Sequence, residues 1–421
     1  MADPSKEQQM RLVRTGSVVA SITLAMTACA GDNDTADGDR EITFWDTADP
    51  ENEAPAFEEQ IREFEEEHDI IVNHQTVPFD ETQDMFKTAA ESGEDAPDVL
   101  RSEVAWTAEF ASLGLLAELD DTPALHNPDD FLEGPYSSTQ YDGSTYAVPQ
   151  VTDSLALLYN RDLLAEAGYE DPPETMAELT EVAISVSEDT DATGLYLNPE
   201  GYFLLPFLYA HGADLLDDQA EAVTVNEPAA VSGLEDVLDL IADGGAVEPD
   251  LAEGYDNMQG AFRDGDAAMI LNGPWAIGDL MGGPQFEDDP DNLGVAALEA
   301  GAPVGGHNYA AYAGSADLDA AHEFIAFMAS ADTQQAISEE LGLLPSRASV
   351  YEADGVADHE IISAFEPVME AAQPRPWIPE AGQLFEPLDQ AYEEALIGES
   401  TPQEALDDVA EAYQGFLPDW E

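Results

Sequence analysis

The chain has 421 residues, of which 91 are acidic and 11 are basic, and its formal net charge is −80. This charge excludes a nucleic-acid-binding surface and disfavours docking on an anionic lipid face, because both partners would repel the protein. Hydrophobic residues make up 44% of the chain, which allows a substantial core and argues against intrinsic disorder. The length fits two domains or one large two-lobed domain.

The N-terminal segment has the pattern of an export signal. Basic residues precede an apolar run at 18–26, and small residues follow it up to Cys29, the only cysteine of the chain. The apolar run is shorter than the ~20 residues that a membrane span needs, so we expect 1–28 to be a signal peptide. A cysteine directly after the cut resembles the lipobox of bacterial lipoproteins, in which the thiol carries a lipid anchor. A plain secretory signal with an incidental cysteine is the alternative.

Behind the signal, the pattern predicts a flexible tether at 29–40 and then an α/β fold. The tether is rich in Gly, Asp and Thr. Strands and helices then alternate, which favours a largely parallel sheet. The expected strands are 41–45, 70–77, 98–100, 146–151 and 155–159, and the expected helices lie around 57–64, 79–90, 176–187, 231–243 and 320–328. A capping box with proline at the first helical position, 401–404, predicts a further helix near the C-terminus.

Four strings along the chain resemble one protein family in the order in which that family carries them. They are DVLRSEVAWTAEFASLGLL at 98–116, VPQVTDSLALLYNRDL at 148–163, AFRDGDAAMILNGPWA at 261–276, and the pair IPEAGQLFEPL and GESTPQEAL within 378–406. The family is that of the solute-binding proteins of bacterial carbohydrate importers, and the similarity is greatest to the maltose/maltodextrin-binding lipoproteins. One string alone is weak, but the ordered set spans the whole mature chain.

The resemblance implies a two-lobed periplasmic-binding-protein-like fold with a ligand cleft and a hinge that the chain crosses more than once. The first α/β lobe is expected at 41–152 and 306–352, and the second at 153–305 and 353–421. The implied function is that of a monomeric receptor that delivers an oligosaccharide to the membrane subunits of an ABC permease. No cofactor and no metal is implied. With Cys29 acylated, the receptor would be held on the outer face of the cytoplasmic membrane.

The resemblance also implies individual ligand contacts. Sugar rings offer hydroxyls at their edges and C–H groups on their faces, so a sugar site combines carboxylates and amides with aromatic rings. Trp275 matches the main stacking ring, and Phe385 stands where the family has a second stacking aromatic, often tryptophan. Glu200 and Tyr202 match the acid and tyrosine that bind hydroxyls, and Asp153 matches an acidic acceptor near the first hinge crossing.

A second group of residues matches family contact positions less closely, because an amide replaces a carboxylate, loop lengths vary or identities differ. Two of its members, His307 and Asn308, are expected beside the cleft as polar loop residues, and two arginines, Arg347 and Arg375, as ion-paired or rim residues. The residues in this group that we carry as candidates are Glu53, Gln83, Glu103, Trp106, His307, Asn308 and Arg347. In so acidic a chain, an ordinary surface role is the default for any single carboxylate, and Trp275 alone would also suit a core.

Other function classes find less support in the sequence. The chain has no His-Glu-x-x-His zinc motif, no Gly-x-Ser-x-Gly elbow and no Walker loop, and the anchor accounts for its single cysteine. A glycoside hydrolase needs only two carboxylates, so counting acids does not exclude one. A structural surface lipoprotein is a third alternative, but it would not need two lobes. A receptor for trehalose, cellobiose or another oligosaccharide also remains open.

The charge balance predicts that the fold is stable only at elevated salt. At ~1 M salt the Debye length is only ~3 Å, so most of the repulsion between surface carboxylates is screened. The midpoint of thermal unfolding, measured from low salt to molar salt, is expected to rise strongly. A midpoint that stays flat over this range would contradict salt adaptation.

Overall fold

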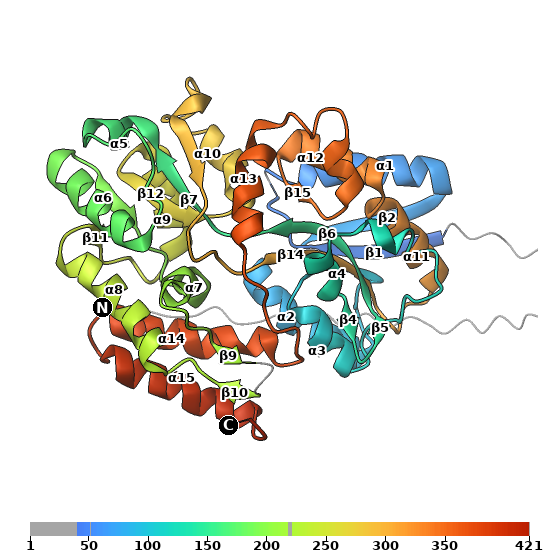
Figure 1. Cartoon of the computed structure of the whole chain (residues 1–421). Coiled ribbons are helices and arrows are strands. Elements are labelled where there is room, and N and C mark those ends of the chain that lie inside the picture. Colours follow the sequence, from blue (N-terminus) through green and yellow to red (C-terminus); the bar gives the residue numbers. More distant parts are fainter. Residues whose placement is uncertain (1–39, 51, 218–220, 421) are drawn as a thin grey trace, which may run out of the picture. The chain divides into compact units, whose positions relative to one another are not determined.

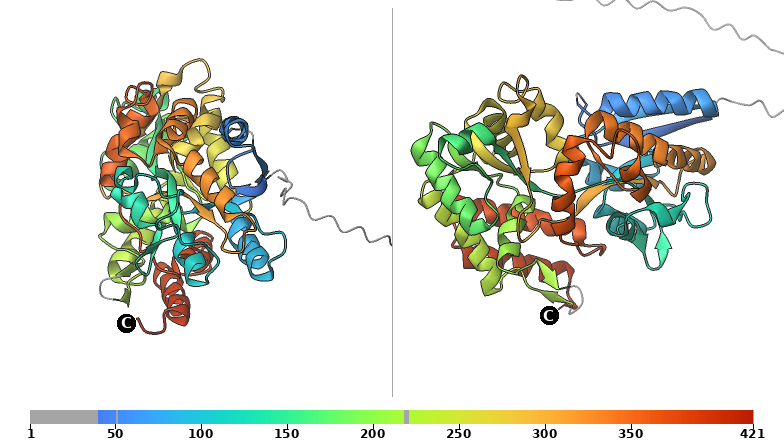
Figure 2. Two further views of the ribbon diagram at one scale, coloured as in Figure 1. Left: turned by 90° about the vertical axis from the view of Figure 1, so that its right-hand side faces the viewer. Right: turned by 45° about the horizontal axis from the view of Figure 1, so that its top comes forward.

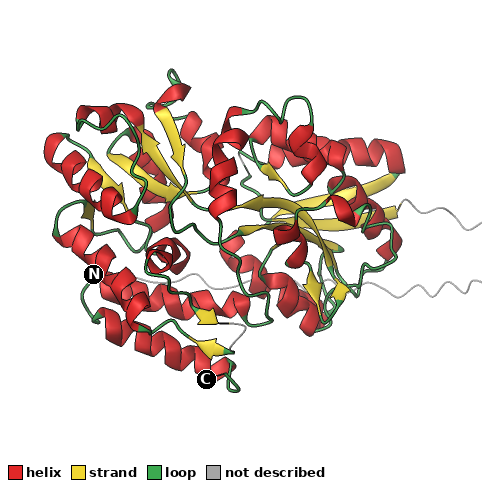
Figure 3. Cartoon of the chain, viewed as in Figure 1, coloured by secondary structure: helices red, strands yellow, loops and turns green. Residues whose placement is uncertain are grey.

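A computed structural model describes residues 40–50, 52–217 and 221–420, and these contain two separate sheets with helices packed around each (Figures 1 and 3). The predicted signal peptide, Cys29 and the tether up to residue 39 lie outside the described residues. Arg40, the last residue assigned to the tether, already belongs to a strand. Arg40 begins strand β1 (Arg40–Asp46) and forms ion pairs with Asp317 and Glu323, both at 2.9 Å.

The first sheet has six strands in the order β15-β6-β14-β3-β1-β2. Strand β1 pairs in parallel with β2 (Ile70–Thr76) and β3 (Val99–Glu103). Strand β14 (Gly305–Ala311) runs antiparallel between β3 and β6 (Ala147–Asp153), and β15 (Leu344–Pro345) is antiparallel to β6. The sheet is therefore mixed, and the expected parallel arrangement is correct only for its first three strands. Two small strands, β4 (Gln140–Tyr141) and β5 (Ser144–Thr145), form a separate hairpin.

Helices cover both faces of the first sheet (Figures 1 and 2). One face packs against α1 (Ala54–His68), α11 (Leu318–Met328) and α12 (Ala331–Leu341), and the other against α2 (Phe79–Ser92) and α3 (Trp106–Ser112). Neighbouring residues of a strand point to opposite faces. Phe44 accordingly packs on the face covered by α1, α11 and α12, and Trp45 packs on the face covered by α2 and α3. The short elements η1 (Pro128–Asp130), α4 (Glu133–Ser137) and η4 (Ala348–Glu352) complete this part.

The second sheet has five strands in the order β11-β8-β12-β7-β13. Its parallel part is β11 (Ala246–Val247), β8 (Thr193–Tyr196) and β12 (Ala267–Asn272), and β7 (Ala156–Asn160) runs antiparallel to both β12 and β13 (Leu293–Ala296). Every residue of β7 and β12 is buried, as expected for central strands covered on both faces. A small pair, β9 (Leu216–Asp217) with β10 (Ala222–Val223), lies outside this sheet.

Around the second sheet the chain builds more helices than the sequence analysis predicted. Helices near the sheet are α5 (Arg161–Glu166), α6 (Met176–Asp189), α9 (Gly254–Asp264), α10 (Ile277–Met281) and α13 (Glu360–Ala371), with short turns η2 (Pro274–Ala276) and η3 (Pro290–Asn292). A helical group, α7 (Gly201–Ala210), α8 (Pro228–Ala242), α14 (Phe385–Leu396) and α15 (Pro402–Phe416), packs together, and η5 (Ala381–Leu384) leads into α14. The predicted capping box at Thr401 and Glu404 is confirmed at the start of α15.

The chain passes between the two sheets three times. The first passage joins β6 to β7, the second is 297–304, and the third, 353–359, leads from η4 to α13. Hydrogen bonds tie the first passage to the second, and the second to the segment after α13. The Ser154 hydroxyl donates to the carbonyl of Pro303 at 3.0 Å, and the amide of Val304 donates to the carbonyl of Gln373 at 2.9 Å. The passages fit a hinge crossed more than once, and the residue boundaries of the two lobes stay a prediction.

Two negative observations apply to the described residues. Among them, no helix combines the length and apolar character that crossing a membrane requires. In residues 40–50, 52–217 and 221–420, no group of three or more His, Cys, Asp or Glu side chains is placed to hold a metal ion.

Candidate functional site

A buried ion pair forms the centre of the candidate site. Arg375, in the segment after α13, donates from Nη1 to Oε1 of Glu103, at the end of β3, over 2.7 Å. The guanidinium carbon also lies 5.3 Å from the ring centre of Phe385 and 5.9 Å from that of Tyr202. Both partners of the ion pair are largely buried, so the pair is only weakly screened by solvent. The ion pair thereby joins the segment after α13 to the end of β3, a central strand of the first sheet.

Asp153, the last residue of β6, lies close to this pair. It is 8% exposed, and its carboxylate accepts no hydrogen bond from any residue that the structure describes. Gly305 pairs with it across the sheet, and a Cβ atom at Gly305 would collide with the Asp153 carboxylate, so a larger residue there would displace this side chain. Burial, and then the charge of Glu103, raise the pKa of Asp153 to about 7, while Arg101 and Arg375 oppose the shift.

Tyr202 and Glu200 lie at the N-terminus of α7. The Tyr202 hydroxyl donates to the carbonyl of Pro303 at 3.2 Å, and its ring meets Phe385 edge-on with centres 6.0 Å apart. Glu200 is exposed, yet desolvation raises its pKa to about 7, with help from the neighbouring carboxylates of Asp389 and Asp80. Because Asp80 belongs to α2, this acidic group also combines residues from the two halves of the fold.

Trp275 follows the central strand β12 in the short turn η2. Its indole nitrogen donates to the hydroxyl of Tyr255 at 3.0 Å, and the ring remains partly exposed. Gly273 lies directly under the indole, and a Cβ atom there would collide with it. The hydrogen bond and the glycine fix the ring orientation, so the exposed part of the indole is a rigid surface.

Trp106, Gln83 and His307 form the side of the site that belongs to the first sheet. Gln83 donates to Oε2 of Glu109 at 2.6 Å, and both Gln83 and Trp106 lie against Gly382 of η5. His307 carries two buried ring nitrogens that find no partner among the described residues. Burial, and then Arg101, hold its pKa well below the usual range, so His307 is neutral.

Glu53 reaches the site from the loop between β1 and α1. Its carboxylate accepts a hydrogen bond from the amide of Asp49 at 3.0 Å, and burial raises its pKa against the opposing charge of Arg101. Arg101 is 2% exposed and is held by Gln150 at 2.8 Å. The charge of Glu53 acts on Asp153 as well, which places Glu53 in the same electrostatic network.

Two of the sequence-predicted contacts, Asn308 and Arg347, lie apart from this group. Asn308 is fully buried and donates to the hydroxyls of Thr107 and Ser138 at 3.2 and 3.0 Å. Arg347 is 3% exposed and donates to the carbonyl of Ala329 at 2.6 Å and towards Asp130 at 3.4 Å. Both side chains therefore support the interior of the first sheet and its loops. The ion-paired state expected for Arg347 and Arg375 is confirmed.

Several residues beside the site were not predicted as contacts. Phe79, Tyr255, Trp377 and Asp389 all contact or act on the predicted residues. Asp389 lies one helical turn after Phe385, and that spacing was a usable signal in the sequence. Phe79 and Tyr255 stand at or near the start of helices, where an aromatic residue is equally typical of a core, so the sequence carried no signal for them.

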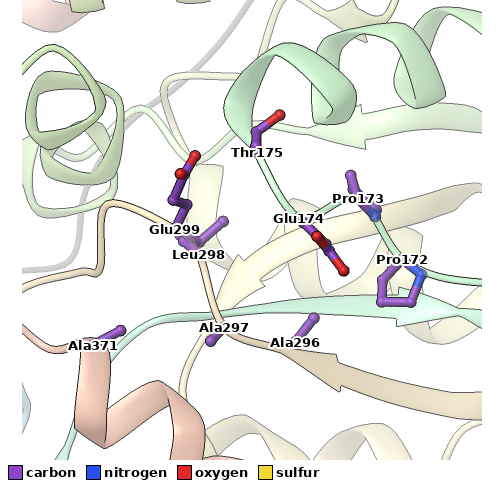
Figure 4. A pocket seen from close by; sticks show the side chains of 9 residues that line it. All are labelled: Pro172, Pro173, Glu174, Thr175, Ala296, Ala297, Leu298, Glu299 and Ala371. Carbon is purple, nitrogen blue, oxygen red and sulfur yellow. The ribbon is translucent and has the colours of Figure 1, made fainter.

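A separate pocket of about 450 Å³ lies elsewhere on the second part of the fold (Figure 4). Its walls are the 172–175 loop before α6, the segment 296–299 after β13, and Ala371 at the end of α13. Figure 4 shows small side chains and two glutamates, Glu174 and Glu299, without an aromatic ring. The pocket contains none of the sequence-predicted contacts and lacks the stacking surface that a sugar requires.

Comparison with known proteins places this arrangement in a family. The family model described as "Bacterial extracellular solute-binding protein" matches residues 59–364. The chain belongs to this family. Its two main sheets with their covering helices match the two-lobed sugar-binding structures of the same class.

Individual members of the family are similar over nearly the whole chain. The GacH receptor of Streptomyces glaucescens GLA.O, solved unliganded and in complex with acarbose and an acarbose homolog, is 45% identical; the match covers 90% of this solute-binding protein and 99% of that chain, with a TM-score of 0.87. Maltose-bound MalE3 of T. maritima is 26% identical over 89% and 99%, with a TM-score of 0.82. The maltotriose-binding protein of Pyrococcus abyssi (strain GE5 / Orsay) is 25% identical over 85% of this chain and 78% of the relative.

The raised pKa of Asp153 predicts how stability depends on pH. Because the folded state holds a proton on Asp153 between its usual pKa near 3.8 and about 7, while the unfolded state does not, the free energy of unfolding falls as pH rises through this window. Asp153→Asn has no carboxyl to ionise, so it avoids this loss of stability at high pH. The variant is expected to exceed the parent by on the order of 2 to 4 kcal/mol at pH 8 and to converge with it below pH 4.

Urea unfolding at fixed high salt, repeated across the pH range, measures this difference. Asp291→Asn, which neutralises an exposed carboxylate in η3, is the matched control and is expected to show little change. A difference between Asp153→Asn and the parent that stays constant from pH 4 to pH 8 would contradict the assignment.

Proposed function

We propose that this protein is the sugar-binding receptor of an ABC importer and that its ligand is a malto-oligosaccharide. The observation that carries the proposal is the combination of partly exposed rings, Trp275 and Phe385, with two carboxylates. Asp153 accepts no hydrogen bond from a described residue, and Glu200 remains exposed. Rings match the C–H faces of a sugar, and carboxylates match its hydroxyls. Asp153 ends a strand of the first sheet, while the other three belong to the second part of the fold, so the set draws on both sheets.

The relatives support the choice of sugar. One is a receptor solved with acarbose, one is a maltose-bound protein and one is a maltotriose-binding protein. The 45% identity of the first is the highest among these three. Trehalose, cellobiose and other oligosaccharides use the same chemistry of stacking and hydroxyl binding, so they form the comparison set of the experiment.

The receptor role further implies a membrane permease as partner and a function without catalysis. We infer that the protein delivers its sugar to the membrane subunits of a permease and acts as a monomer. We also infer that it is not an enzyme, because the family is one of solute-binding proteins. A glycoside hydrolase, the rival function, would convert maltotriose to shorter sugars during overnight incubation, whereas a receptor returns the trisaccharide unchanged.

Calorimetric titration against maltose, maltotriose, trehalose and cellobiose tests the function. We expect binding of the two maltose-series sugars, and we expect Trp275→Ala to cost at least ~2 kcal/mol, or about thirtyfold in affinity, as buried aromatic anchors do. Glu200→Gln should cost less, because the amide still accepts a hydrogen bond but loses its charge. Phe385→Trp should maintain or strengthen binding, because a larger ring offers more stacking area.

Trp420→Ala is the control for loss of a tryptophan, since Trp420 is also partly buried but lies near the C-terminus. It should leave affinity unchanged, and circular dichroism should show an intact fold for every variant. If Trp275→Ala binds maltose and maltotriose as tightly as the parent, the site is wrongly placed. If the parent binds only trehalose or cellobiose, the proposed sugar is wrong.

The export signal supports a lipid-anchored location outside the cytoplasmic membrane. We infer that Cys29 carries the anchor, because it is the single cysteine and directly follows the expected cut. Cys29→Ser is expected to release the protein into the medium or leave the signal uncleaved, which membrane fractionation and mass spectrometry measure. Acyl chains found on the Cys29→Ser protein would rule out this role.

A further inference from the structure

Phe79, the first residue of α2, is unusually exposed for a large aromatic side chain. It keeps 46% of its surface in solvent, and in the described part of the chain it is the one aromatic among the exposed large hydrophobic residues. A single exposed apolar side chain is ordinary on a protein surface and by itself marks no binding site. Its location therefore decides whether it has a function.

The ring of Phe79 is held against two residues of the candidate site. Its centre lies 5.3 Å from that of Trp106 at an interplanar angle of 33°, and 6.1 Å from that of His307 at 74°. Trp106 is 6% exposed and His307 is half-buried. Phe79 is thus the outer member of a three-ring group built from α2, α3 and β14, and the inner members fix its position.

Polar groups surround this ring where the two halves of the fold approach each other. Asp80, the next residue, acts electrostatically on both Glu200 and Asp389 of the other half. Gln83, one turn further along α2, lies against Gly382. An apolar ring face bordered by carboxylates and an amide suits a ligand with C–H faces and hydroxyl edges, and suits a purely apolar partner poorly.

We propose that Phe79, backed by Trp106, is an additional glucose subsite that binds the third ring of a malto-oligosaccharide. This inference rests on the proposed function. Trp275 and Phe385 on the second half supply two stacking surfaces, which is what a disaccharide needs. Phe79 is a third surface, on the first half, and it makes the receptor prefer chains of three or more units over maltose.

The test compares sugars of different length on a pair of matched variants. Phe79→Ala removes the ring, and Leu113→Ala removes an equally exposed apolar side chain, 50% in solvent, beyond the end of α3. Calorimetric titrations with maltose, maltotriose and maltotetraose are made in molar salt. We expect Phe79→Ala to weaken binding of the two longer sugars about tenfold, to change maltose less than twofold, and Leu113→Ala to change none of them.

Phe79→Trp adds a second measurement, since a larger ring should keep the preference for longer sugars. Unchanged affinity of Phe79→Ala for maltotriose and maltotetraose would overturn the subsite while the parent still binds these sugars. An equal loss for all three sugars would also overturn it, because the ring would then contribute to the shared part of the site. A parent protein that binds none of the sugars would instead overturn the proposed function, and the subsite with it.

Discussion

The ion pair between Arg375 and Glu103 is the interaction on which the arrangement of the site depends. It joins the segment after α13 to the end of β3 through a 2.7 Å hydrogen bond, and both side chains are largely withdrawn from water. Removing one partner of a buried pair leaves the other charge uncompensated, which is costly. The same segment is held at Gln373 by backbone bonds to the second passage between the sheets, so the pair and the hinge act on one stretch of chain.

The ion pair uses one of the few basic side chains in an extremely acidic chain. With 91 acidic and 11 basic residues, most carboxylates have no basic partner available, and the few arginines are assigned to specific positions. Arg101 holds Asp46 and Gln150 beneath the site, and Arg375 holds Glu103. The charges of both arginines act on Asp153, whose carboxylate accepts no hydrogen bond from a described residue, and burial raises its pKa to about 7. A neutral ligand rich in hydroxyls can satisfy such a carboxyl without bringing a further charge into the site.

Periodicity and capping signals predicted most elements of the first sheet and the last helix, because these segments have local patterns that packing reinforces. The strand expected at 41–45 is β1, the helix expected at 79–90 is α2, and the capping box at 401–404 starts α15. Helix α7 escaped prediction because it is apolar on nearly all sides and contains Pro206, so it shows no amphipathic period. The direction of β14 was also not accessible, since the antiparallel return depends on the crossing between the two halves.

The surroundings of a candidate residue were predictable where its neighbours in the sequence fix them, as for Trp275, which lies in η2 directly over Gly273. The surroundings were not predictable where a shift of one residue along a strand decides which side chain reaches the site. His307 and Asn308 are adjacent in β14, and the pairing of β14 with β6 shifts register between them. His307 meets Phe79, whereas Asn308 is buried against Thr107 and Ser138. A sequence does not show where a strand shifts its register, so it does not show which of two adjacent residues reaches the site.

A crystal structure of the protein with bound maltotriose, grown in molar salt, would show where the sugar binds. We expect sugar density between the two halves, with a glucose ring over Trp275 and a hydroxyl donating to the carboxyl of Asp153. Sugar density in the pocket formed by 172–175 and 296–299, with Trp275 and Asp153 free of ligand, would contradict it.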